Sequence, residues 1–266
     1  MNTEIVGIVK QTPQILSTIY CDLAQPSVKK IGAALETVFE FSASFLLPLK
    51  LLNEKFRMNF EKRLNEYKQK IENIPDGELC EVNPQIGIPL LQKLSYTTND
   101  EIANLFTNLL AKASWIKTVN MAHPSFVQLI ERLSLDEAKI ITSLNHKSVI
   151  SLIPYTLSYD SNIGKMRESG KILHFKIELL FPLNASMYVD NLCSMGILAI
   201  KPRRGIWVGD KHEEYKKMIT DYFISAAHKK SYSVHLENLN ISLGWDIDYE
   251  ITDFGRSFIN TCISNK

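Results

Sequence analysis

The sequence has no closely spaced cysteines and no long apolar run, and its first residues do not predict a secretory leader. Its four cysteines, Cys21, Cys80, Cys193 and Cys262, form no C-x-x-C pair, which argues against a disulfide framework. The best membrane-span candidate, Phe41–Leu49, is nine uncharged residues long, whereas a spanning helix needs about 20 apolar residues. The N-terminus has no apolar core behind a basic start. We therefore predict a cytoplasmic protein with reduced, mostly buried thiols.

The sequence also lacks an excess of charge of either sign. It has 30 Lys and Arg against 29 Asp and Glu, and up to Ser125 there are 13 of each. A protein that binds duplex DNA over a wide surface usually has a net basic domain, because phosphate neutralisation supplies much of the affinity. The balance argues against a broad nucleic-acid binder but leaves room for a small basic patch. With 45% hydrophobic and 22% charged residues, the chain can bury a sizeable core.

Motifs for common catalytic and cofactor sites are missing as well. The eleven glycines are scattered and form no phosphate-binding loop, and neither G-x-S-x-G nor H-E-x-x-H occurs. The one dense group of potential metal ligands, Asp210, His212, Glu213 and Glu214, lies where a helix is expected to begin, and carboxylates favour that position. We predict no enzyme activity, no cofactor, no metal and no small-molecule substrate. A site assembled from residues far apart in the sequence stays as an alternative.

Helical periodicity dominates the first half of the chain. Apolar residues recur at helical spacing over 31–49, and Pro48 is expected to kink or split that helix. The punctuated stretch 72–89 is predicted to be a linker, followed by a short helix over 90–94 and by a helix over 100–115 capped by Asn99. Ser134 and Glu137 have the spacing of a capping box. A long amphipathic helix is predicted from a second apolar stripe, with Lys62 and Arg63 on its charged face: Leu52, Phe56, Phe60, Leu64, Tyr67 and Ile71.

The second half mixes strands with helices. Residues 148–157 and 171–180 are rich in β-branched and apolar residues, and their weak periodicity leaves strand and helix both open. A helix over 184–195 is predicted to end at Gly196. A hairpin over 197–208 with a basic tip, a helix over 212–229, one or two strands within 231–249 and a closing helix over 252–263 are expected to follow.

These patterns predict a mainly α protein that is α+β overall. We expect an N-terminal helical bundle over 1–122, with the long amphipathic helix, followed by a winged-helix-like domain over 123–266. The segments 126–145, 184–195 and 197–208 supply its helices and hairpin. Winged helices bind nucleic acids in some proteins and dock other proteins elsewhere, so this fold does not decide the function.

Several segments resemble the abortive-infection alpha (Abi-alpha) family. They include Tyr20–Pro26, Lys30–Leu35, His123–Phe126 and Leu133–Ala138, with Tyr249–Gly255 near the end of the chain. The resemblance implies a bacterial phage-defence role, in which an infected cell stops growing or dies. It supplies no catalytic residues, because the matched positions are Pro breaks, caps and apolar residues.

We therefore predict a non-enzymatic defence protein that acts through a protein partner or through self-association. One alternative is a nucleic-acid-binding regulator, and another is an effector that perturbs a membrane after a trigger. The candidate contacts for a partner or nucleic acid are Lys201, Arg203 and Arg204. The candidate contacts for a membrane or an oligomer lie on the apolar helix 31–52: Phe41, Phe45, Leu46 and Leu49.

The membrane alternative predicts an effect of Leu46→Asp in cells. Expression of the unaltered chain in bacteria should lower the membrane potential before growth stops, and the substitution should remove that effect because a carboxylate is costly in hydrocarbon. A potential-sensitive dye and culture density, followed together, measure both. Growth arrest with an intact potential would point to a protein or nucleic-acid target instead.

Overall fold

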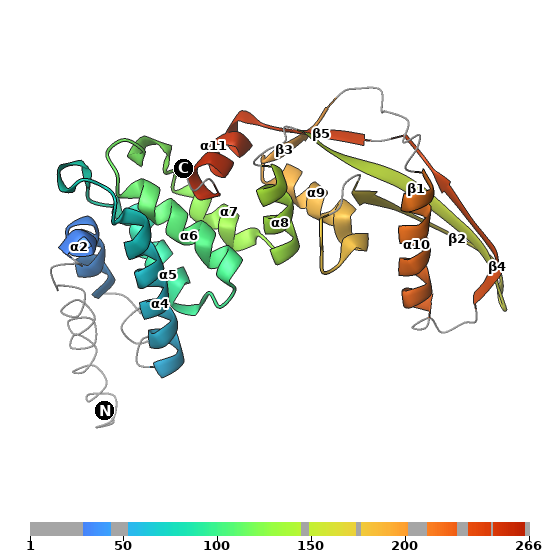
Figure 1. Ribbon diagram of the computed structural model, residues 1–266, viewed down its shortest axis with the longest axis horizontal. Coiled ribbons are helices and arrows are strands. Elements are labelled where there is room, and N and C mark those ends of the chain that lie inside the picture. The colour runs from blue at the N-terminus through green and yellow to red at the C-terminus, as the bar shows by residue number, and fades with distance from the viewer. Residues whose placement is uncertain are drawn as a thin grey trace, which may run out of the picture. The chain divides into compact units, whose positions relative to one another are not determined.

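The computed structural model describes residues 29–43, 53–144, 149–173, 177–201, 212–227, 234–245 and 247–263 (Figure 1). Tertiary contacts divide the chain into two compact units. Unit 1 comprises Met1–Ala138 and Ser257–Lys266, and unit 2 comprises Lys139–Arg256. The boundary predicted between residues 122 and 123 falls inside unit 1, and the closing helix returns the chain to that unit.

Unit 1 is built from helices, as the periodicity of the first half predicts. Short 3-10 turns follow α4 and α6, and the buried side chains of α4, α5 and α6 form much of the core. Helices α8 and α11 each straddle the boundary between the units. The elements are α2 (Lys29–Ala43), α4 (Glu54–Ile71), η1 (Asp76–Glu78), α5 (Pro84–Tyr96), α6 (Asp100–Ala113), η2 (Val119–Met121), α7 (Ser125–Arg132), α8 (Leu135–Leu144) and α11 (Asp253–Cys262).

The long amphipathic helix is α4, and it buries most of the predicted stripe. Phe60, Leu64, Tyr67 and Ile71 are all buried. The predicted charged face is wrong at one position, because Arg63 is only 1% exposed. Its long side chain reaches polar groups on α5 and α6, and a buried cation needs such partners.

The predicted linker over 72–89 is wrong in its second half, because α5 already begins at Pro84. The Asn83 side chain caps this helix by accepting from the Gln85 N–H at 2.9 Å. Proline is favoured in the first turn of a helix, where its missing N–H is not needed. The Asn83-Pro84 pair therefore begins a helix, and Pro89 is accommodated inside it.

Three predicted helix ends are confirmed by their hydrogen bonds. The Asn99 side chain accepts from the Ile102 N–H at 3.0 Å at the start of α6. Ser134 and Glu137 form the reciprocal bonds of a capping box. At the end of α9 (Ala185–Ser194), Gly196 has φ 73°, and the next N–H bonds back to the Leu192 carbonyl at 3.0 Å. Together with the bond from the Gly196 N–H to the Cys193 carbonyl at 2.9 Å, it forms a Schellman motif.

Unit 2 contains an antiparallel sheet, which decides the open choice for 148–157 in favour of a strand; of 171–180, only residues 171–173 belong to a strand, and 177–180 form neither strand nor helix. Its strands are β1 (Val149–Ser161), β2 (Gly164–Leu173), β3 (Leu198–Ile200), β4 (Val234–Leu243) and β5 (Ile247–Ile251). β1 pairs with β2 along most of its length, and its other edge pairs first with β5 and then with β4. β3 pairs with the far edge of β5. Turn η3 (Pro182–Asn184) leads into α9.

Helix α10 (His212–Ala227) packs on one face of the sheet formed by β2, β1 and β4 (Figure 1). Alternate residues of each strand point toward it, as the period of two in a strand requires. On the other face of β1, Ile150 and Leu152 are buried near the start of the strand, whereas positions 156, 158 and 160 are polar. The buried cluster is Ile153, Leu157, Tyr159, Ile172, Tyr215, Ile219, Phe223 and Ile241.

The winged-helix hypothesis stays a prediction. The helices α7, α8 and α9 and the strand β3 are present, but the described partner of β3 is β5. Residues 206–208, the predicted second strand of the hairpin, lie outside the described residues. In the sheet order β1-β5-β3, β5 lies between β1, which precedes α9 in the chain, and β3, which follows it.

The start of α11 lies unusually close to the end of α9. The Thr252 hydroxyl accepts from the Gly255 N–H at 2.8 Å and donates to the Gly196 carbonyl at 2.5 Å. A Cβ atom on Gly255 would lie 2.1 Å from the carbonyl oxygen of Ile197. Since that oxygen belongs to the backbone, this contact requires glycine.

We predict that Gly255→Ala destabilises the chain by about 2–3 kcal/mol, because the new methyl group would displace the Ile197 backbone. Gly77→Ala is the matched control, since nothing lies within 4 Å of a Cβ atom there. It should change stability by less than about 0.5 kcal/mol. Urea unfolding followed by circular dichroism compares the two, and equal midpoints would refute the close approach.

Candidate functional site

The basic residues selected from the sequence are only partly described. Lys201 forms an ion pair with Glu250, with 3.4 Å between Nζ and Oε2, and its N–H bonds to the Asp248 carbonyl. Arg203 and Arg204 lie outside the described residues. Lys201 is therefore anchored to β5, and the structure brings neither arginine to a described site.

The apolar contact residues selected from the sequence lie mostly outside the described part of the chain. Phe45, Leu46 and Leu49 belong to 44–52, and the side chain of Phe41 is not described. The same helix, α2, buries Ile31, Leu35 and Val38 in unit 1. The first part of the predicted apolar helix therefore belongs to the core of unit 1.

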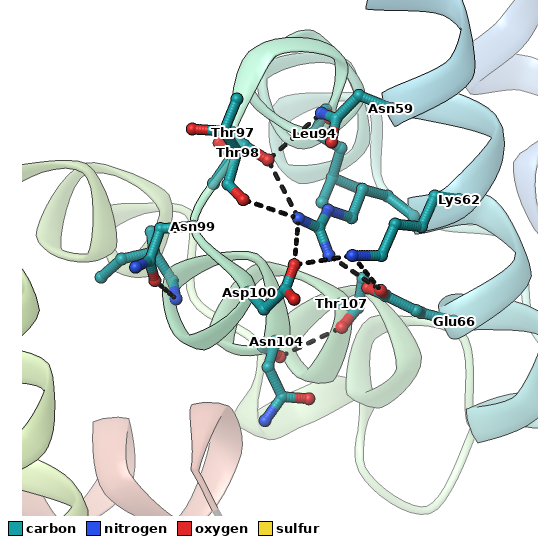
Figure 2. A network of polar contacts seen from close by, with 12 residues as sticks. Asn59, Lys62, Glu66, Leu94, Thr97, Thr98, Asn99, Asp100, Asn104 and Thr107 are labelled. Atoms are coloured by element: carbon teal, nitrogen blue, oxygen red, sulfur yellow. Dashed lines mark hydrogen bonds and ion pairs between the residues drawn. The ribbon is translucent and has the colours of Figure 1, made fainter.

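The most connected polar group in unit 1 is centred on Arg63 (Figure 2). Its guanidinium donates to the carbonyls of Thr97 and Thr98 at 3.3 and 3.2 Å, and it pairs with Glu66 at 2.8 Å and Asp100 at 2.7 Å. Its Nε has no partner among the described residues. The arginine joins α4 to the segment that connects α5 with α6.

Asn59, one turn earlier on α4, extends this group. Its amide donates to the carbonyls of Leu94 at 2.9 Å, Ser95 at 3.2 Å and Thr97 at 3.1 Å (Figure 2). The last carbonyls of a helix have no partner within the helix. Asn59 and Arg63 supply those partners for the end of α5, so the group has a clear role in the fold.

An open groove of about 560 Å³ runs beside this group along α4 and α6. Lys62 pairs with Asp100 at 2.8 Å, and both Lys62 and Arg63 lower the pKa of that carboxyl. Lys70 donates to Asn104 at 2.7 Å and to Asn108 at 2.5 Å, and burial lowers the pKa of its amine. The charged and amide groups here are engaged with one another, which suits a structural network better than a substrate site.

Unit 2 carries a different surface, made of apolar side chains exposed to solvent. We define the apolar surface as Leu180, Phe181, Leu183 and Met187, on the segment that leads through η3 into α9. Leu180, Phe181 and Met187 are 59%, 63% and 57% exposed. Single exposed apolar residues are common, but a contiguous group of large ones marks an interaction site.

A small pocket lies directly beside this surface. Its apolar lining comes from the end of β2, the segment before η3 and α10, and its volume is about 90 Å³. Cofactor and substrate pockets are typically about 300–1,000 Å³, so this one suits a single side chain. It is lined by Ile172, Leu173, Ile177, Leu179, Pro182, Glu214, Tyr215 and Met218.

Backbone hydrogen bonds hold the segment that presents the apolar surface. The Leu179 N–H donates to the Ile177 carbonyl at 2.9 Å, and the Asn184 N–H donates to the Phe181 carbonyl at 3.0 Å. The Lys139 amine reaches the Glu178 carbonyl at 2.9 Å. A segment ordered before binding loses less conformational entropy when a partner docks.

Sequence reasoning missed this surface, although the signal was available. Residues 179–183 read Leu-Leu-Phe-Pro-Leu, an apolar run with neither helical nor strand alternation. Such a run in a loop exposes side chains that a helix or strand would bury, and exposure without a functional reason is disfavoured.

The described thiols show no sign of activation. Cys80, Cys193 and Cys262 are unbridged, and burial raises the pKa of each. A reactive cysteine needs a lowered pKa, because the thiolate is the nucleophile. The described residues also contain no group of three or more His, Cys, Asp or Glu side chains able to hold a metal ion.

Within the described residues, every helix is too short or too polar to cross a bilayer.

The two units thus define a mainly α protein with an α+β second unit and an exposed apolar surface. Residues 55–262 match the family model described as abortive infection alpha, and the chain belongs to that family. No curated protein and no solved structure matches the chain.

We predict that Arg63→Met destabilises the chain by about 2–4 kcal/mol, because it removes the buried cation that bonds to the Thr97 and Thr98 carbonyls and pairs with Glu66 and Asp100. Arg57→Met on the same helix is the control. Arg57 is exposed and lies 3.8 Å from Glu61, so its loss should cost less than about 0.5 kcal/mol. Urea unfolding measures both, and a similar small loss for Arg63→Met would contradict the structural role.

Proposed function

We propose that this chain is a non-enzymatic phage-defence protein that acts by binding a protein partner through the apolar surface. The carrying observation is that Phe181 and Met187 are more than half exposed, while Leu179 and Pro182 of the same segment line a pocket the size of one side chain. Family membership supports the abortive-infection role. The partner would insert one aliphatic or aromatic side chain into the pocket and cover the apolar surface around it.

The energetics of the apolar surface support a protein partner. Burying one large apolar side chain is worth about 1.5–3 kcal/mol, and interfaces concentrate their affinity in a few such residues at a pocket. Covering Leu180, Phe181, Leu183 and Met187 together would supply the centre of an interface.

The described chemistry gives no comparable support to catalysis. The thiols have raised pKa values, and the polar side chains beside the groove of unit 1 bond to each other. Three unbridged cysteines also suit the cytoplasm, the compartment that we propose.

We predict that Phe181→Asp combined with Met187→Asp removes protection against phage without unfolding the chain. Both side chains are exposed in the free protein, so the substitutions should leave its thermal midpoint nearly unchanged while placing unpaired charge in the interface. Survival of infected cultures and thermal unfolding measure the two effects. Full protection against phage by a folded double variant would contradict the proposal.

Ile163→Asp provides the matched control, because Ile163 is 65% exposed and lies outside the apolar surface. This variant should protect as well as the unaltered chain. A photo-crosslinking residue at position 181 should yield an adduct of defined mass in infected cells, while the same residue at position 163 should not. Equal adducts at both positions would indicate chance collisions.

A further inference from the structure

Beyond the buried Ile150 and Leu152, the outward face of β1 and of the strands beside it is polar, and its described residues carry unpaired positive charge. Residues 153, 155, 157 and 159 of β1 face α10, so residues 154, 156, 158 and 160 face outward. The register then assigns outward positions on the neighbouring strands, because directly paired residues share a face. Thr156 pairs with Ser169 on β2 and Ser242 on β4.

Three cations lie on this outward face along β2. Pro154, Ser158 and Asp160 of β1 pair with Lys171, Arg167 and Lys165 respectively. Among the described residues, these cations make no ion pair or hydrogen bond. They recur at alternate positions of an edge strand, with Ser169 in the remaining place.

Negative charge on the same face is small and already engaged. Asp160 accepts a hydrogen bond from the Asn238 amide at 2.8 Å. Glu168, the one carboxylate of β2, has the opposite parity and bonds to the Tyr159 hydroxyl on the α10 side. The described side chains of this face are therefore net positive, although the whole chain carries a formal charge of only +1.

Apart from Pro154, the outward residues next to the cations and on β4 carry hydroxyls or an amide. They are Thr156, Ser158, Ser169, Asn240 and Ser242. Lys, Arg, Ser, Thr and Asn are the side chains that proteins use to contact phosphate and sugar. None of these outward positions holds an aromatic residue, whereas surfaces for single strands usually stack bases on aromatic rings.

From this arrangement we propose that the outward face of β2, β1 and β4 binds double-stranded nucleic acid through its phosphates, without reading sequence. The three cations on β2 provide the charge, and the hydroxyls and the amide complete the hydrogen bonds. Pairing of two β2 edges would set cations against cations, which disfavours a second copy of this chain as the occupant. The inference is independent of the partner proposed for the apolar surface.

The test is the salt dependence of duplex binding by the full chain. Two short fluorescent DNA duplexes of unrelated sequence are titrated, from low to moderate salt, and followed by anisotropy. Neutralising three phosphates predicts a slope of about −2.7 in log affinity against log salt, since each contact contributes about −0.9. The two sequences should bind equally.

Substitutions then assign the binding to the proposed face. Lys165→Gln should reduce the slope by about 0.9, and adding Arg167→Gln and Lys171→Gln should remove binding at low salt. Lys217→Gln is the control, because Lys217 is exposed on α10 in the same unit. It should bind like the unaltered chain, as should Phe181→Asp.

Three results would overturn the proposal. They are absence of duplex binding at low salt, an unchanged slope in the folded triple variant, or an equal loss with Lys217→Gln. Vesicles containing anionic lipid are measured alongside, and tighter binding to them than to duplex would assign the face to a membrane surface instead. Circular dichroism confirms that each variant is folded, which the exposure of Lys165 and Arg167 predicts.

Discussion

The buried guanidinium of Arg63 is the interaction on which unit 1 depends. A helix end exposes carbonyls that need donors, and the end of α5 lies against α4, away from full solvation. Arg63 and Asn59, one turn apart on α4, donate to these carbonyls, and Arg63 also holds Asp100 in the first turn of α6. The same face of α4 continues with Tyr67, whose hydroxyl lies 2.5 Å from that of Ser114. Helix α4 thus sets the positions of α5 and α6, because its buried polar side chains bond to groups at the end of α5 and the start of α6.

Unit 2 is organised by the two faces of its sheet. Apolar residues at alternate positions of β1 pack against α10, and the residues between them form the polar outward face. The end of β2 also contributes Ile172 and Leu173 to the pocket beside the apolar surface. A single strand therefore supports two distinct surfaces, one apolar and one cationic, which are suited to different kinds of partner.

Some elements could be predicted from the sequence, and others could not. Helices α4, α6, α9 and α10 were predictable because their apolar residues recur at helical spacing, and Gly196 and the Ser134–Glu137 pair end or begin helices through local bonds. The Asn83-Pro84 pair led to the wrong prediction of a linker, because the same two residues are typical of a turn and of the start of a helix. β1 and β2 were ambiguous because apolar runs fit either structure until a partner strand is present. The apolar surface was missed because exposure depends on what packs over a residue.

The sequence by itself determined the family, the mainly α character and most helix ends, because local spacing and local hydrogen bonds carry that information. The tertiary structure alone decided that Arg63 is buried, that β3 pairs with β5, and that the segment carrying Phe181 lines a pocket through Leu179 and Pro182. It also decided that Lys165, Arg167 and Lys171 share one face with little opposing charge, since strand register sets which residues stand together. Those contacts join residues distant in sequence, and no local pattern encodes them.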